Sequence, residues 1–225
     1  MDLCPLLIWS TCGFGLGVLV AALVFPPDAM LVVFAEGGAV EQAAIVFWLV
    51  VAAYVVWRFR LRSRWAFAGT SLCLFSAARE ADLHISYTGY SVLKLGFYTS
   101  SEYLLREQIV AGLLVAMLAV SAFIIFGALI NRLREVWQGG EFKDWHAAAI
   151  FVIGLIVFSK ILDRAPAFIE EVLGYAVTPR VFAMSLALEE ALETLLPLLV
   201  LAVVRLIARE RDRTHSRRDS DCAPA

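Results

Sequence analysis

The chain contains few residues of the types that usually bind metals or form covalent cross-links. Its 225 residues include four cysteines and three histidines. The cysteines have neither a paired nor a metal-type spacing, so the sequence gives no support to a zinc ribbon or a disulfide framework. The chain also lacks a nucleophile elbow, a phosphate-binding P-loop, a dinucleotide fingerprint and a zincin motif. These absences exclude several common enzyme classes as far as motifs can identify them.

Charged residues are also scarce, and long apolar runs take their place. Hydrophobic residues make up 61% of the chain, charged residues make up 18%, and the mean hydropathy is +0.78. This composition is typical of a polytopic membrane protein and not of a soluble domain. Membrane lipid is therefore the expected partner, nothing indicates nucleic-acid binding, and the oligomeric state is left open. We expect an all-α transmembrane helical bundle.

Hydropathy predicts six membrane spans. They are expected at about 6–25, 38–57, 65–84, 108–130, 146–163 and 181–207. The first is interpreted as a retained span, because no positive n-region or small-residue cleavage site accompanies it. Residues 1–207 then form a single transmembrane domain, and the charged segment 208–225 is expected to be a disordered tail.

The lysines and arginines predict the orientation of these spans. They concentrate between the second and third spans, between the fourth and fifth, and after the sixth. With six spans, these segments and the N-terminus share one side, which the positive-inside rule makes cytoplasmic. That side carries thirteen basic and eight acidic residues, whereas the outer segments and outer helix halves carry six basic and thirteen acidic ones. We expect both termini to be cytoplasmic and the membrane to be the cell inner membrane.

Four polar clusters fall on the outer side of the predicted bundle. They are Glu36 to Glu41, Arg79 to His84, Lys160 to Arg164 and the glutamates of the last span. Charged side chains inside membranes usually face the bundle interior and pair with one another. The carboxylates outnumber the three nearby bases, so the surplus must be protonated, hydrated or bound to a cation. The sequence therefore predicts an acid-rich polar site that opens to the extracytoplasmic side.

The last predicted span, 181–207, carries three of these acids. Glu189, Glu190 and Glu193 would together cost roughly 8–10 kcal/mol at full depth, whereas the fifteen Leu, Ile, Val and Phe residues return about 4.5–9 kcal/mol. The helix is thus marginal alone and is expected to need polar partners. Pro197 cannot donate a hydrogen bond to the Glu193 carbonyl, so we expect a kink and a cation-friendly point there.

Three functions are compatible with this polar set. The first is an enzyme acting on a lipid or lipid-linked substrate, with Glu80 or His84 as general base and Lys160 stabilising negative charge. The second is proton- or cation-coupled transport, for which chains of membrane carboxylates are typical. The third is a structural or assembly subunit held together by salt bridges. The candidates for binding substrate or ions are Glu36, Glu41, Arg79, Asp82, Asp163, Arg164, Glu189, Glu190 and Glu193.

A divalent metal ion is a possible cofactor of such a site. Glu80 and His84 are spaced to share one helical face, as are Glu189 and Glu193, and together they could supply three or four ligands. Only one histidine is available, because His146 and His215 fall on the cytoplasmic side. The Glu-x-x-His pairs of a di-iron bundle are absent. The alternative is that His84 is a hydrogen-bonded structural residue.

Two short motifs carry a resemblance to other proteins. Glu36-x-Gly-x-x-Glu41 is followed one span later by Arg79-Glu-x-Asp-x-His84. This pattern resembles one in small uncharacterised bacterial multi-pass inner-membrane proteins, and it covers roughly residues 30–90. The resemblance implies a bacterial inner-membrane location and no particular activity.

Overall fold

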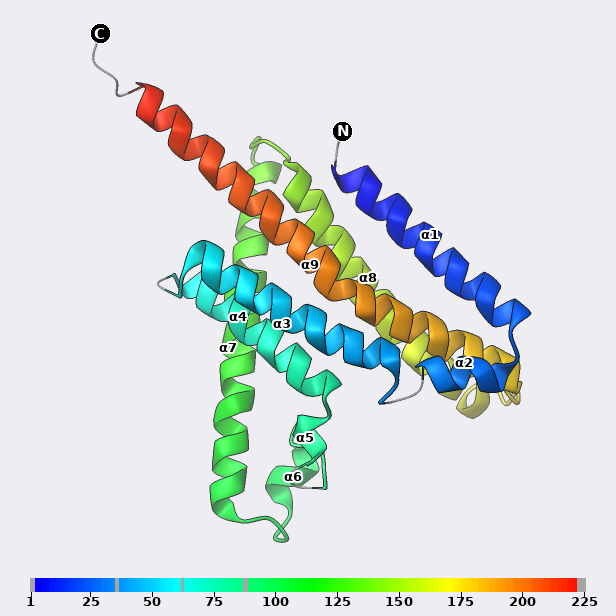
Figure 1. The fold of residues 1–225 in the computed structure, drawn as a ribbon. Helices are drawn as coiled ribbons and strands as arrows, with labels where there is room; N and C mark the ends of the chain where they lie inside the picture. The colour runs from blue at the N-terminus through cyan, green and yellow to red at the C-terminus, as the bar shows by residue number, and fades with distance from the viewer. Residues whose placement is uncertain (1–2, 35–36, 62, 87–88, 222–225) are drawn as a thin grey trace. The chain divides into compact units, whose positions relative to one another are not determined.

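The regular structure of the chain is helical. The computed structural model describes residues 3–34, 37–61, 63–86 and 89–221, and within these residues it contains helices and no strand. Figure 1 shows the helices in chain order. They are α1 (Leu3–Val24), α2 (Pro27–Phe34), α3 (Ala39–Phe59), α4 (Arg64–Glu80), α5 (Leu83–Ser86), α6 (Leu95–Thr99), α7 (Leu105–Trp137), α8 (Asp144–Glu171) and α9 (Pro179–Asp221). The predicted all-α class is confirmed.

Five helical stretches of the described chain are long and apolar enough to cross a membrane. They are Pro5–Val24, Pro27–Phe59, Leu105–Trp137, Asp144–Glu171 and Pro179–Arg213. The predicted span 65–84 is not among them. Its helix, α4, has 17 residues, which at 1.5 Å per residue cover about 25 Å of a hydrocarbon core about 30 Å thick. The chain therefore has the helices of a multi-pass membrane protein, with five clear candidate spans.

The helices form two compact units, of which the first comprises α1, α2, α8 and α9. Within it, α8 and α9 lie side by side and antiparallel, and α1 and α2 pack on α9 (Figure 1). Small side chains line α9 where these helices meet, because Ala183, Ala187 and Ala191 recur every four residues and are buried. Small residues let helix backbones approach closely inside a membrane. This stripe explains how α9 accepts neighbours along much of its length.

The second unit comprises α3 to α7, and its centre is a helical hairpin of α3 and α4. Ser63 is the N-cap of α4 and its hydroxyl accepts a hydrogen bond from the Ala66 N–H at 3.1 Å. The buried positions of α4 are mostly small, so α4 packs closely on α3 and on α7. The hairpin turn includes Arg60, which has a left-handed φ of 54°.

The segment between α4 and α7 is held by aromatic side chains. The ring of the fully buried Phe97 lies 4.6 Å from that of Tyr103 and 5.2 Å from that of Tyr98, measured between centroids. Gln108 on α7 donates from Nε2 to the carbonyls of Phe97 (3.0 Å) and Ser100 (2.9 Å). We call this set of five residues the aromatic cap. It ties α6 to the start of α7.

The last helix is longer than the hydropathy pattern predicts. α9 continues to Asp221, into the segment 208–225 that the charge pattern predicts to be disordered. Positions 205–213 contain four arginines together with leucine, alanine and glutamate, and all of these are good helix formers. Helix propensity therefore extends the element beyond the apolar span.

Candidate functional site

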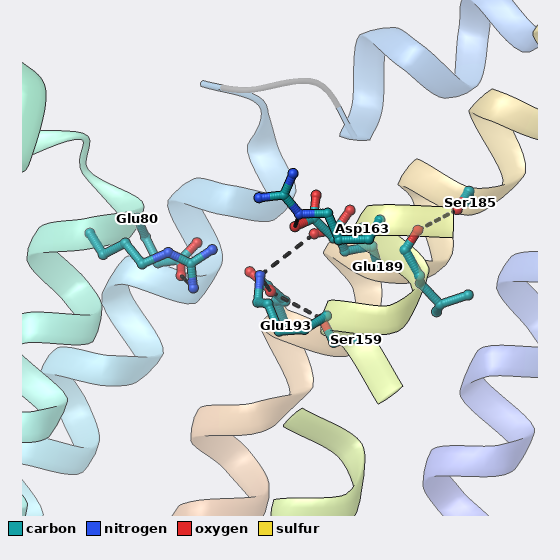
Figure 2. A network of polar contacts seen from close by, with 10 residues as sticks. Glu80, Ser159, Asp163, Ser185, Glu189 and Glu193 are labelled. Carbon is teal, nitrogen blue, oxygen red and sulfur yellow. Dashed lines mark hydrogen bonds and ion pairs between the residues drawn. The ribbon is translucent and has the colours of Figure 1, made fainter. Parts of the chain in front are cut away.

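The main polar cluster lies between α8 and α9. Lys160 on α8 places its Nζ 2.6 Å from Oε1 of Glu193 and 3.8 Å from Oε1 of Glu189, both on α9. Ser159 donates from Oγ to the same Glu193 oxygen at 3.0 Å. Figure 2 shows Glu189 and Glu193 of α9 directed toward α8. We refer to Ser159, Lys160, Glu189 and Glu193 as the Lys160 cluster.

The members of the Lys160 cluster differ in exposure. The side chain of Glu193 is 7% exposed and that of Glu189 is 12% exposed, whereas that of Lys160 is 43% exposed. Ser159 is fully buried, and its hydroxyl is used as a donor to Glu193. A serine in this position serves to hold the carboxylate and is not accessible as a nucleophile. The cluster is therefore a pair of shielded carboxylates with one more exposed ammonium group.

A second contact between the two helices compensates for a proline. Pro166 lies inside α8, and it has no N–H for the carbonyl of Leu162, four residues earlier. Ser185 on α9 donates its hydroxyl to this carbonyl at 3.0 Å (Figure 2). A serine from a neighbouring helix is one of the ways in which membrane helices satisfy a backbone group released by proline. This bond explains why α8 continues to Glu171 instead of ending near residue 163.

The register of α8 and α9 is marked by a second ion pair. Lys143 bonds to Glu210 near the other end of the two helices. Lys143 precedes Lys160 by 17 residues, and Glu210 follows Glu193 by 17 residues. At 1.5 Å per residue, this places the two lysine–glutamate pairs about 25 Å apart, close to the thickness of a hydrocarbon core. The two pairs therefore flank the uncharged runs 145–159 of α8 and 194–204 of α9.

Other predicted site residues of this unit lie beside the cluster. Asp163 Oδ2 is 3.9 Å from Nε of Arg164, and these side chains are 43% and 85% exposed. Glu190 is half-buried, and its carbonyl accepts a hydrogen bond from Thr194 at 2.9 Å. The structure thus brings Lys160, Glu189 and Glu193 into one cluster, while Asp163 and Arg164 pair with each other.

The remaining predicted site residues belong to the second unit. Arg79 Nη1 lies 3.8 Å from Oε1 of Glu80, and Glu41 accepts a hydrogen bond from the Gly37 N–H. Glu36 and the side chain of His84 lie outside the described residues. Asp82 is exposed and its carbonyl accepts a hydrogen bond from the Ser86 hydroxyl at 2.7 Å.

One geometric expectation about this segment is wrong. The spacing of Glu80 and His84 predicts that they share a face of one continuous helix, but α4 ends at Glu80 and α5 begins at Leu83. Asp82, between them, has a left-handed φ of 49°. Aspartate tolerates this conformation better than most residues, because its short side chain bonds locally. The i, i+4 rule for one helix therefore does not apply across the break.

The predicted metal site can be compared with the described side chains. Among them, no group of three or more His, Cys, Asp and Glu is placed to hold a metal ion. The predicted ligand set also includes His84, whose side chain is not described, and it draws on both units. Metal binding by that set stays a prediction.

Three residues of the α8–α9 contact were missed by the sequence analysis. Ser159 and Ser185 have no charge and sit in apolar runs, where serine is usually a packing residue. Pro166 gave the usable signal, since a proline inside a long apolar helix requires another donor for the carbonyl four residues before it. That signal predicts a hydroxyl on a neighbouring helix without identifying Ser185.

Comparisons with family models, curated proteins and solved structures found no match to the chain.

Proposed function

We propose that the chain is a multi-pass membrane protein that moves a proton or a small cation, with the Lys160 cluster as its binding site. The observation that supports this is that one ammonium group serves two shielded carboxylates. When both carboxylates are ionised the cluster has a net charge of −1. Ionised carboxylates are costly inside a membrane, so a proton or a cation is attracted to Glu189 or Glu193.

The backbone next to Glu193 favours the same function. Pro197 is fully buried in α9 and removes the main-chain N–H that would otherwise bond to the Glu193 carbonyl. Membrane transporters commonly coordinate cations with carboxylates and with carbonyls at interrupted helices. Glu193 thus contributes a carboxylate and the carbonyl opposite Pro197 to the part of α9 that Lys160 contacts. An arriving cation would compete with Lys160 for the carboxylates.

We further propose six membrane crossings, with α4 as the short one. If α3 crosses the membrane, α4 must return, because the two helices form a hairpin with a four-residue connection. The boundary residues Arg64 and Glu80 of α4 can extend toward the two surfaces, which lessens the mismatch of a 17-residue helix. Six crossings place the three basic segments on one side of the membrane.

This topology puts the Lys160 cluster in the outer half of the membrane. Both termini are then cytoplasmic, and Lys160 lies 16 residues, or about 24 Å, from the cytoplasmic start of α8. The resemblance of the Glu36–Glu41 and Arg79–His84 motifs to bacterial inner-membrane proteins gives the proposed location.

Reporter fusions after residues 61, 100, 140 and 175 test this topology, since reporters at 61 and 140 should be cytoplasmic and the other two external.

Flux measurements in liposomes test the proposed transport. The full-length protein is reconstituted, and proton and Na⁺ fluxes are followed with internal dyes for the wild type, Glu189→Gln, Glu193→Gln and the control Glu210→Gln. The control removes a carboxylate from a lysine pair of α8 and α9 outside the cluster. We expect flux in the wild type and the control and at least tenfold less flux in the two cluster variants. Absence of wild-type flux of either ion, or flux that survives both cluster substitutions, overturns the proposal.

A structural role is the second candidate, and the register of the two ion pairs favours it. Two lysine–glutamate pairs with the same spacing on both helices fix the position of α8 relative to α9 along the helix axis. If this is the whole role, each single variant, Lys160→Glu or Glu193→Lys, should impair folding, and the double variant that exchanges the two charges should fold again. Neither the wild type nor the double variant should then show ion flux. The lipid-directed enzyme with Glu80 and His84 stays a prediction of the sequence.

A further inference from the structure

The other half of α9 carries a second feature that could bind a ligand. A hollow of about 130 Å³ on the surface of α9 is lined by Leu198, Leu201, Ala202, Arg205, Leu206 and Arg209. These positions recur at intervals of three or four residues, so they form one helix face. The hollow is separate from the Lys160 cluster, because its nearest member to that cluster follows Glu193 by five residues.

The lining changes from apolar to basic along the helix axis. Residues 195–204 of α9 contain no polar side chain, and Arg205 is the first charged residue after them. Leu198 lies seven residues before Arg205, or about 10 Å deeper in the membrane. Arg209 lies one turn beyond Arg205, toward the aqueous phase. This face therefore crosses from hydrocarbon depth to head-group depth, as a phospholipid does.

The two arginines are available for an anion. Both are exposed, and neither forms an ion pair with another residue in the described ranges of the chain. The nearest acid in sequence, Glu210, is bound to Lys143 of α8. Arginines at i and i+4 can contact the oxygens of one phosphate group with charge-assisted hydrogen bonds.

We propose that this face of α9 binds one anionic phospholipid, with its phosphate held by Arg205 and Arg209 and an acyl chain lying along Leu198, Leu201 and Ala202. An anionic head group is favoured over a zwitterionic one because two arginines and no acidic residue line the hollow. A chain of methylene groups fits the apolar part, where only apolar atoms face the membrane interior. The proposal is independent of the transported ion and of the Lys160 cluster.

Native mass spectrometry of the full-length protein in detergent tests this binding. The probes are dioleoylphosphatidylglycerol and dioleoylphosphatidylcholine, titrated separately. We expect phosphatidylglycerol to bind at least tenfold more tightly. The double substitution Arg205→Gln with Arg209→Gln should weaken its binding about 30-fold, which corresponds to about 2 kcal/mol, or about 1 kcal/mol for each basic residue.

Matched variants separate a built site from general charge attraction. Arg211→Gln with Arg213→Gln removes the same charge from the same helix but from positions that do not line the hollow, so it should weaken binding less than fivefold. Arg205→Lys with Arg209→Lys keeps the charge and should retain most of the binding. Equal affinity for the two lipids, an equal loss in both glutamine pairs, or displacement of the lipid by equimolar inorganic phosphate overturns the proposal. Displacement by phosphate would identify a small-anion site instead.

Discussion

The hydroxyl of Ser185 donates to the carbonyl of Leu162 at 3.0 Å, across the contact between α9 and α8. Pro166 is the residue that would otherwise supply the N–H for this carbonyl, so a side chain of one helix replaces a backbone donor of the other. The bond joins the helices one turn from the Lys160 cluster. The bond therefore helps α8 to continue past Pro166, and it holds α8 against α9 close to Lys160.

This relationship predicts a coupling between Ser185 and Pro166. Ser185→Ala should lower the free energy of unfolding by about 0.5–1.5 kcal/mol, because the Leu162 carbonyl loses its donor. In a Pro166→Ala background, the restored N–H of residue 166 can take over, and the same substitution should have little effect. The measurement is a double-mutant cycle by SDS titration in mixed micelles. Equal losses in the two backgrounds would show that the hydroxyl does not replace the missing N–H.

The Lys160–Glu193 pair predicts a larger effect. Removing one partner of a buried pair costs about 3–5 kcal/mol, and because the Lys160 side chain is 43% exposed we expect about 2–3 kcal/mol for Lys160→Met. The double variant Lys160→Met with Glu193→Gln should recover part of this loss, since the closest and most buried carboxylate is then neutral, while Glu189 loses only a contact of 3.8 Å. The matched control is Arg164→Gln, which removes a positive charge from an 85% exposed side chain of the same helix.

The control variant should change stability by less than about 0.5 kcal/mol. Unfolding is followed by circular dichroism during SDS titration of all four proteins. The interpretation of Lys160 as the partner of a shielded carboxylate is wrong if Arg164→Gln is as damaging as Lys160→Met. It is also wrong if the double variant is no more stable than the single one.

The sequence predicts the features that depend on hydropathy and charge along the chain, and it does not predict those that depend on backbone angles or on packing between helices. The α1 and α7 spans follow from long uncharged runs, and the α8 and α9 spans follow from apolar runs that charged residues interrupt. The side-by-side position of Lys160 and Glu189 follows from equal depth in two antiparallel helices. The break at Asp82 could not be derived, because hydropathy does not report backbone φ. The partnership of Ser159 with Glu193 also depends on helix rotation, which is set by packing between α8 and α9 and not by either sequence alone.

The Lys143–Glu210 pair should behave differently from the Lys160 pair. Its side chains are 32% and 30% exposed, and it lies near the end of the apolar part of α8. Lys143→Gln should therefore lower the free energy of unfolding by only about 0.2–1 kcal/mol, and the loss should shrink at high salt because exposed charges are screened. Unfolding of Lys143→Gln and Lys160→Met is compared at 50 mM and 500 mM KCl. We expect the loss in Lys160→Met to be nearly independent of salt, and equal salt dependence would contradict the proposed depths of the two pairs in the membrane.

The aromatic cap predicts a local effect in the second unit. Gln108 Nε2 donates to the carbonyls of Phe97 and Ser100. Gln108→Glu keeps the shape of the side chain but replaces the donor with an oxygen that repels both carbonyls, at a cost of about 1–3 kcal/mol. The amides of residues 97–104 should then exchange with solvent at least fivefold faster, as expected when local opening becomes easier by 1 kcal/mol or more. Hydrogen exchange read by mass spectrometry measures this, with the exposed Arg106→Gln as the control.

Amides in the middle of α7 should exchange at the same rate in all three proteins, because they do not depend on the cap. Unchanged exchange at 97–104 in Gln108→Glu, or equal acceleration in Arg106→Gln, would show that Gln108 does not hold the cap on α7.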